Sequence, residues 1–110
     1  MKHRRGLSGA DRAARSQLRK LLDQADGLVH GSFIQMARRC GNPNCRCARE
    51  DQKHLSWYLG ITQKRKTRMK HIAKHREGMV RRWIKAYQEA RSLLDQISHE
   101  AWKRLAEGRE

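Results

Sequence analysis

The chain has 110 residues, and its 26 Lys and Arg residues outnumber its 11 Asp and Glu residues, which gives a formal net charge of +15. Only 37% of the residues are hydrophobic, so the chain can bury no more than a modest core. No apolar run approaches the roughly 18 residues that a membrane-spanning helix needs, and no hydrophobic segment follows the basic N-terminus as in a secretory signal. The sequence therefore predicts a cytoplasmic protein with no membrane partner. A balance this basic favours nucleic acid as the partner.

The first predicted element is a helix over residues 9–26, which follows a basic, flexible arm at residues 1–8. Ser8 suits the N-cap position and Asp11 suits the first turn. Gly27 suits the end of the helix. Apolar residues recur between these limits at spacings of three and four, as on one face of a helix: Ala14, Leu18, Leu21, Ala25 and Leu28.

The middle of the chain, residues 28–73, predicts a small antiparallel sheet of three strands. Residues 28–39 are rich in β-branched and aromatic residues and alternate in type, which suits a short strand. Residues 55–62 and 67–73 flank the polar stretch from Gln63 to Lys66, which predicts a hairpin with a short turn. A loop that contains every cysteine of the chain separates the first two strands.

The last predicted element is one long helix over residues 75–107. Its apolar residues repeat at spacings of three and four, and the simplest interpretation is a face that packs on the sheet and on the first helix. The alternative is a coiled coil between two copies of the chain, and about 30 helical residues are long enough for both. The predicted interaction seam is Val80, Trp83, Tyr87, Leu94 and Ile97. These elements predict an α+β fold with residues 9–110 in a single domain.

The three cysteines lie within eight residues, Cys40-Gly-Asn-Pro-Asn-Cys45-Arg-Cys47. In a reducing cytosol such a cluster is more often a metal site than a disulfide. Zinc takes four Cys or His ligands, and His54 follows Cys47 by seven residues. The sequence thus predicts a structural Zn²⁺ site formed by Cys40, Cys45, Cys47 and His54.

Other interpretations of this cluster stay open. His30 and His71 are alternatives for the fourth zinc ligand. A disulfide that leaves one free thiol, a reactive thiol activated by neighbouring arginines, and inert buried cysteines are alternatives to a metal site.

The order of these motifs over residues 31–98 resembles a family of small, uncharacterised bacterial and archaeal proteins. Members of that family carry a Gly-Ser strand, a C-G-x-P-x-C-x-C loop, a His before an aromatic strand, a Lys/Thr/Arg strand and a long helix with a Val-x-x-Trp pattern. The resemblance supports zinc binding and implies an association with transposases and other mobile elements, but it implies no reaction. The matching positions are Gly31, Ser32, Cys40, Gly41, Pro43, Cys45, Cys47, His54, Trp57, Tyr58, Thr67 and Arg68.

The densest positive charge lies in residues 64–76, which hold seven Lys and Arg residues and no acid. On a hairpin these cations would bind phosphates with salt-dependent affinity. Either Trp57 or Tyr58 must face away from the core of a regular sheet, where an aromatic ring beside cations suits stacking on unpaired bases. The alternative is a solvated turn with both rings in the core. The candidate nucleic-acid-binding residues are Arg4, Arg5, Arg38, Arg39, Arg46, Arg49, Trp57, Lys64, Arg65, Lys66, Arg68, Lys70, Lys74 and Arg76.

The sequence predicts a non-enzymatic, zinc-stabilised nucleic-acid-binding accessory protein of a mobile element or phage, cytoplasmic or associated with the nucleoid. RNA or single strands are favoured over duplex, because the predicted basic sheet carries aromatic residues and no helix-turn-helix is evident. The alternative is an adaptor that docks through its long helix to a transposase or polymerase subunit, or to a second copy. An enzyme is not expected, because no Ser/His/Asp set or phosphate loop is found, and Glu50 and Asp51 would point apart.

Overall fold

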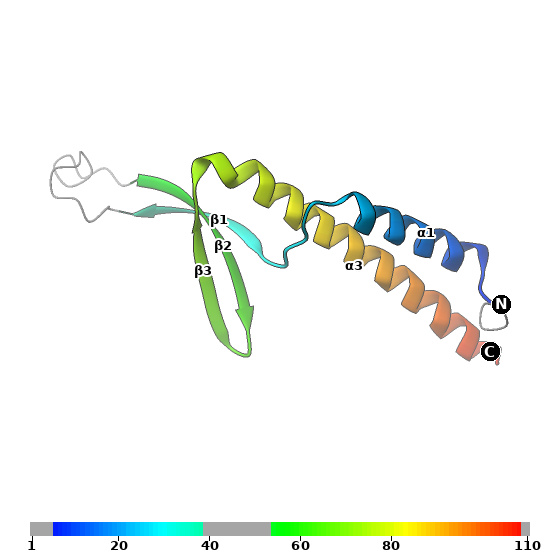
Figure 1. Ribbon diagram of the computed structural model, residues 1–110. Helices are drawn as coiled ribbons and strands as arrows, with labels where there is room; N and C mark the ends of the chain where they lie inside the picture. The colour runs from blue at the N-terminus through cyan, green and yellow to red at the C-terminus, as the bar shows by residue number, and fades with distance from the viewer. Residues whose placement is uncertain (1–5, 39–53, 109–110) are drawn as a thin grey trace, which may run out of the picture. The chain divides into compact units, whose positions relative to one another are not determined.

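The computed structural model of the chain describes residues 6–38 and 54–108. Its elements follow one another as α1 (Gly9–Gln24), β1 (Ser32–Arg38), β2 (His54–Gln63), β3 (Lys66–Ile72), the short 3-10 helix η2 (Lys74–Arg76) and α3 (Glu77–Ala106), as Figure 1 shows. The α+β prediction, with an N-terminal helix, a three-stranded sheet and a long C-terminal helix, is confirmed.

The chain divides into two compact units. The helical unit comprises Met1–Leu28 and Lys85–Glu110, and the sheet unit comprises Val29–Ile84. Helix α3 contributes its first two turns to the sheet unit and the remainder to the helical unit.

Helix α1 begins as the sequence predicts. The Ser8 side chain accepts a hydrogen bond of 3.0 Å from the backbone N–H of Asp11, which satisfies one of the free donors of the first turn. The helix ends at Gln24, two residues before the predicted end, because Ala25 already has an extended backbone. Its backbone N–H still donates to the Leu21 carbonyl, so the last turn is closed.

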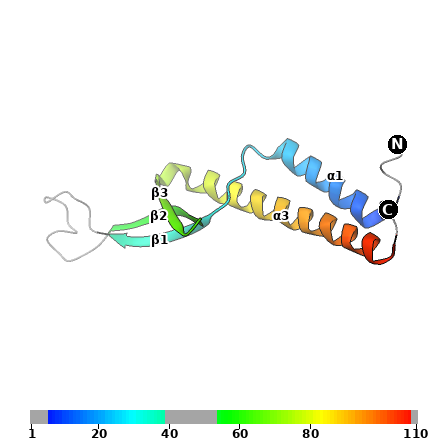
Figure 2. The same cartoon turned by 90° about the horizontal axis from the view of Figure 1, so that it is seen from below.

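The helical unit pairs α1 with the C-terminal part of α3, and the two run in opposite directions (Figures 1 and 2). Its buried apolar residues are Leu7, Ala14, Ala90 and Leu93. Leu94 of the predicted interaction seam is 55% exposed and does not join this core, whereas its neighbour Leu93 is 8% exposed. Adjacent residues on a helix lie about 100° apart, so a face centred on Ala90 and Leu93 leaves Leu94 at its margin.

The sheet unit contains one antiparallel sheet in the order β1-β2-β3. Strand β1 pairs with β2 from Ser32 opposite Gly60 to Arg38 opposite His54. Strand β3 pairs with β2 from Lys66 opposite Gln63 to Ile72 opposite Trp57. The predicted hairpin is confirmed, but its turn has two residues, Lys64 and Arg65, rather than four.

The core of the sheet unit includes Val80 and Ile84 of α3, both less than 10% exposed. The backbone N–H of Val29 donates to the carbonyl of Trp83 over 3.2 Å, which connects the start of the unit to its end.

Candidate nucleic-acid interface

The hairpin of β2 and β3 extends beyond the end of β1, the remaining strand of the sheet. The pairing of β1 ends at Ser32 opposite Gly60, whereas β2 continues to Gln63 and β3 begins at Lys66. Residues 61–68 therefore form a two-stranded segment, which we call the ribbon. Every ribbon residue is exposed except Ile61, which is half-buried.

Positive charge covers the ribbon and continues along the chain behind it. No acidic residue occurs between positions 54 and 76. The ribbon cations and those that follow are all exposed, and none forms an ion pair with another residue in the described part of the chain. These seven cations, the basic hairpin, are Lys64, Arg65, Lys66, Arg68, Lys70, Lys74 and Arg76.

The strand register sorts the ribbon residues onto two faces. Residues that lie opposite each other share a face, and alternate residues along a strand change face. Gln63 and Lys66 are opposite each other, as are Ile61 and Arg68, so their side chains lie on one face. Thr62 and Thr67 lie on the other face, where their hydroxyl oxygens are 2.9 Å apart in a hydrogen bond. One face of the ribbon is thus cationic and amide-bearing, and the other is neutral.

The turn at the tip of the ribbon holds two cations in an unfavourable backbone conformation. Lys64 has a φ of 50° and Arg65 a φ of 64°. Two-residue hairpin turns require positive φ at both positions, and Asn-Gly is the pair that adopts them most easily. A non-glycine residue in this region costs roughly 1 kcal/mol or more. The charge at the tip is therefore present at the expense of local stability.

The aromatic residues of β2 face opposite sides of the sheet. The ring of Trp57 stacks on that of Phe33, with 4.7 Å between the ring centroids and an interplanar angle of 5°. The ring of Tyr58 meets that of His71 edge to face at 5.3 Å. The predicted division of the two rings between the two faces is confirmed.

Arg81 lies beside the Trp57 stack, and sequence reasoning did not identify it. Its guanidinium carbon lies 4.6 Å from the centroid of Phe33 and 4.7 Å from that of Trp57. Because these two distances nearly equal the separation of the two rings, the cation lies beside the stack on the same side of Trp57 as Phe33, and the two contacts together occupy one face of the indole. Arg81 follows the buried Val80 at the start of α3, and no spacing in the sequence singles out one arginine among its neighbours.

Most of the predicted zinc and arginine residues lie outside the described residues. For Arg38 and His54 the structure describes only the backbone, which pairs them across β1 and β2. Within residues 6–38 and 54–108 there is no group of three or more His, Cys, Asp or Glu residues that could hold a metal ion. The remaining members of the two predictions are Arg4, Arg5, Arg39, Cys40, Cys45, Arg46, Cys47 and Arg49.

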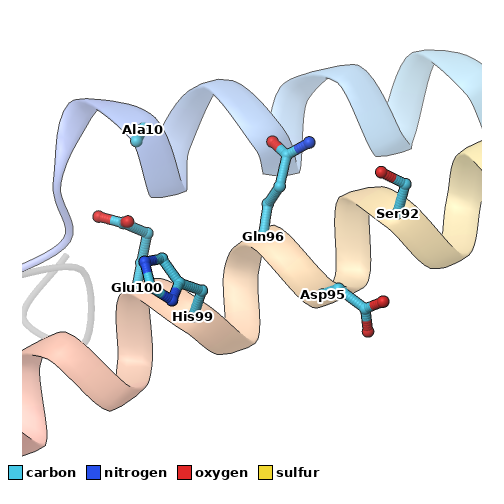
Figure 3. A pocket seen from close by; sticks show the side chains of 6 residues that line it. All are labelled: Ala10, Ser92, Asp95, Gln96, His99 and Glu100. Atoms are coloured by element: carbon cyan, nitrogen blue, oxygen red, sulfur yellow. The ribbon is translucent and has the colours of Figure 1, made fainter.

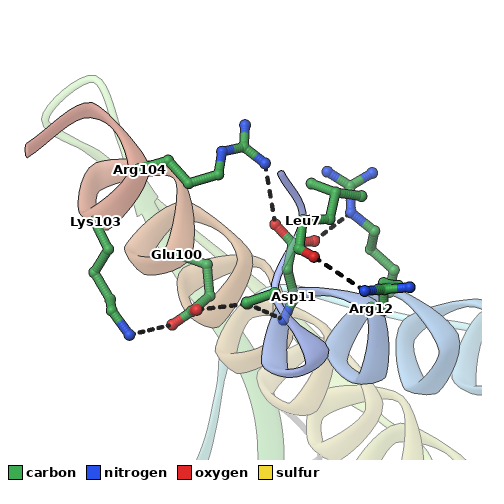
Figure 4. Close-up of polar contacts among 8 residues, drawn as sticks. Leu7, Asp11, Arg12, Glu100, Lys103 and Arg104 are labelled. Atoms are coloured by element: carbon green, nitrogen blue, oxygen red, sulfur yellow. Dashed lines mark hydrogen bonds and ion pairs between the residues drawn. The ribbon is translucent and has the colours of Figure 1, made fainter. Parts of the chain in front are cut away.

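In the helical unit, in contrast, two acidic residues where α1 begins form ion pairs. Asp11 is 1% exposed and forms ion pairs with Arg15 and, over 3.9 Å, with Arg104 (Figure 4). The Ser8 hydroxyl donates to Glu100 over 2.6 Å, and Lys103 lies 3.6 Å from the same carboxylate. The hydrogen bond from Ser8 lowers the pKa of Glu100, and the charge of Lys103 lowers this pKa further.

A pocket of about 330 Å³ lies between α1 and α3 in the helical unit (Figure 3). Its wall combines one small residue of α1 with polar residues of α3. Gln96 points toward α1, whereas Asp95 points away from it. The lining residues are Ala10, Ser92, Asp95, Gln96, His99 and Glu100.

Comparison with known proteins places the chain in a family without assigning it an activity. Residues 11–82 match a family model described as a domain of unknown function, DUF6788. The chain belongs to this family. The DUF6788 match spans most of α1, the whole sheet and the start of α3. No curated protein and no solved structure matches the chain. Among the described residues, neither helix is long and apolar enough to cross a membrane.

Proposed function

We propose that this DUF6788 protein is a non-enzymatic nucleic-acid-binding accessory protein that uses the basic hairpin as its main contact surface. The observation that carries the proposal is the set of seven exposed cations with no ion-pair partner in the described chain. Phosphates are the anions that such a surface fits best, because each contact releases a condensed counterion from the nucleic acid.

A purely structural explanation accounts for part of this charge. Strand β3 is an edge strand, and edge strands carry charged side chains that prevent pairing with other chains. Protection of an edge would be satisfied by charges of either sign, however, and by fewer of them. It also gives no reason for cations at the two turn positions where the backbone conformation is unfavourable.

The first test is the salt dependence of binding. Mixed-sequence RNA and DNA oligonucleotides are titrated with the full chain at 50 and 200 mM salt. Five contacts from the ribbon and Lys70 predict a slope of about −4 in log K against log salt. Binding that is absent at 50 mM salt, or that salt does not change, contradicts the proposal.

A charge-matched pair of variants then locates the surface. Lys66→Gln with Arg68→Gln removes two cations from β3, and we expect the slope to become shallower by about two. Arg19→Gln with Lys20→Gln removes two exposed cations from α1 and serves as the control. Equal losses for the two double variants would show that net charge, rather than the hairpin, drives binding.

We further propose that Cys40, Cys45, Cys47 and His54 hold a structural Zn²⁺ in the loop between β1 and β2. The backbone pairing of Arg38 with His54 brings the two ends of that loop together, so all four residues belong to one closed connection. A bound zinc would fasten the end of the sheet opposite the ribbon. Zinc content measured with and without Cys47→Ser tests this: equal content in both proteins contradicts it.

The association with a transposase or another mobile-element machine, which the sequence resemblance implies, also remains a proposal. A cytoplasmic or nucleoid location would suit such a role. Nucleic acid that copurifies with the chain, sequenced after nuclease treatment, would identify the element it serves. Sequences drawn evenly from the whole genome would contradict the association.

The second candidate function is an adaptor that docks through α3 to a subunit of such a machine. The favouring observation is a pocket of about 340 Å³ in the helical unit, which Leu28, Tyr87 and the exposed Leu94 line on its apolar side. Leu94→Glu should then abolish association with the subunit while nucleic-acid binding is retained. The outcome that rejects the adaptor is an unchanged association.

A further inference from the structure

We infer that the ribbon enters the major groove of B-form duplex DNA. This inference rests on the proposed function and adds to it the class of nucleic acid and the mode of binding. It departs from the sequence-based preference for RNA or single strands, which depended on an exposed aromatic ring beside the cations.

The first argument is the shape of the ribbon. Beyond Gly60, strands β2 and β3 each continue for three residues without β1 beside them, which is roughly 10 Å at 3.3 Å per residue before the turn. The major groove of B-DNA is about 8.5 Å deep and about 12 Å wide, and it admits a two-stranded ribbon. Two strands lie about 4.8 Å apart, so their backbones and side chains fill this width. The ribbon is therefore long enough to reach the base edges before the sheet meets the phosphates.

The second argument is the chemistry of the cationic face. Arg68 carries a guanidinium group, which pairs with the O6 and N7 atoms of guanine, and Gln63 carries an amide, which pairs with adenine. Both residues lie on the same face of the ribbon as Lys66. Lys70 lies on the same face but farther from the turn, in the part of the hairpin that β1 also joins. There it is placed to meet a phosphate at the rim of the groove. One face thus combines base-reading groups near the tip with phosphate-binding groups behind them.

The third argument is the turn. Lys64 and Arg65 occupy positive-φ positions that a neutral Asn-Gly pair would occupy with less strain. A tip that enters a groove between two phosphate backbones gains from charge at this point. A hairpin that lies flat on an extended single strand would gain equally from charge anywhere along its length.

The fourth argument concerns the alternatives. Single-strand binding depends on aromatic rings that stack on unpaired bases, and one face of the Trp57 ring is already taken by Phe33 with Arg81 beside it. The rings of Tyr58 and His71 already contact each other. Duplex RNA has a deep and narrow major groove that side chains cannot read. Of the four common forms of nucleic acid, duplex DNA is the one that this ribbon fits.

The experiment compares four fluorescein-labelled probes of equal length and sequence: duplex DNA, duplex RNA, single-stranded DNA and single-stranded RNA. We expect the full chain to bind duplex DNA at least tenfold more tightly than duplex RNA at 100 mM salt. Dimethyl sulfate then methylates guanine N7, which lies in the major groove, and bound protein should protect a run of guanines.

The decisive variant replaces the turn pair by Lys64→Asn with Arg65→Gly, which keeps the hairpin geometry and removes two charges. We expect it to lose N7 protection and at least tenfold in affinity for duplex DNA, while the Arg19→Gln, Lys20→Gln control keeps its protection. Unprotected N7 atoms, or tighter binding of RNA or single strands, overturn the inference and leave the proposed function standing. Absence of salt-dependent binding to all four probes overturns both.

Discussion

The two units of the molecule use charge in different ways. The sheet unit has 14 Lys and Arg and three Asp and Glu residues, a net charge of +11, and the helical unit has 12 and eight, a net charge of +4. In the helical unit Asp11 and Glu100 each meet cations at the junction of α1 and α3. In the sheet unit the basic hairpin has no such partners in the described chain. The ion pairs of the helical unit therefore serve folding, whereas charge in the hairpin is available to a ligand.

The largest expected effect is the loss of stability when Asp11 is replaced. Replacing a carboxylate that is 1% exposed by Asp11→Asn leaves Arg104, whose side chain is 23% exposed, without its counter-charge. Removing one member of a buried pair costs about 3–5 kcal/mol, and the partial exposure of the two arginines favours the lower end. Urea denaturation measures the loss. Asp23→Asn, an exposed change of the same kind on the same helix, should cost less than about 0.5 kcal/mol.

Either of two outcomes would contradict this comparison between the units. If Asp11→Asn and Asp23→Asn had equal effects on the free energy of unfolding, the paired charges of the helical unit would contribute nothing to the fold. If Asp11→Asn weakened nucleic-acid binding at a temperature where it is folded, the division of labour between the units would be wrong.

The next effect tests the aromatic stack of the sheet unit. Trp57→Ala removes a half-buried ring that Phe33 and Arg81 both contact, and we expect a loss of about 2–3 kcal/mol, below the range for a fully buried tryptophan. Trp57→Phe retains the stack and should cost less than half as much. Affinity for single-stranded RNA should not differ between Trp57→Phe and the parent protein. A large loss of that affinity would show that the indole stacks on bases after all.

The third effect has the opposite sign. The change Lys64→Asn with Arg65→Gly relieves unfavourable φ angles at two positions, and we expect it to stabilise the chain by about 1–2 kcal/mol. Calorimetry should show a rise of several degrees in Tm. Since the same variant is expected to lose DNA affinity, stability and binding would change in opposite directions. A Tm that does not rise would mean that the turn charges carry no stability cost.

The sequence predicted the helices and the hairpin well because those elements depend on local signals. The Ser8 cap, the three-and-four spacing of α1 and the alternation of β1 each act within a few residues. The turn was placed correctly but made too long, because Gln63 and Lys66 are as polar as the true turn residues and sequence polarity does not reveal that they pair.

The remaining features depend on contacts between distant parts of the chain. The sequence predicts Asp11 only as a residue of the first helical turn. Its burial depends on Arg104, which lies 93 positions later. Arg81 contacts Trp57 only because α3 meets the sheet at that point. No periodicity within one element carries such information, so these residues were found only in the structure.

The smallest expected effect is the pH dependence contributed by Glu100. Its pKa is lower in the folded protein than in the unfolded chain, chiefly because the Ser8 hydroxyl donates to the carboxylate and secondarily because Lys103 is near. A carboxylate with a depressed pKa stabilises the fold above its unfolded pKa of about 4.3, and this contribution is lost as the pH falls through the lower folded pKa. The stability difference between the parent protein and Glu100→Gln should therefore be present at pH 7 and should disappear as the pH falls below the folded pKa. Ser8→Ala should remove most of that pH dependence, and because it also removes the N-cap it should cost about 1 kcal/mol that does not vary with pH. A difference between parent and Glu100→Gln that persists unchanged at low pH would show that packing of the side chain, rather than its charge, matters where α1 begins.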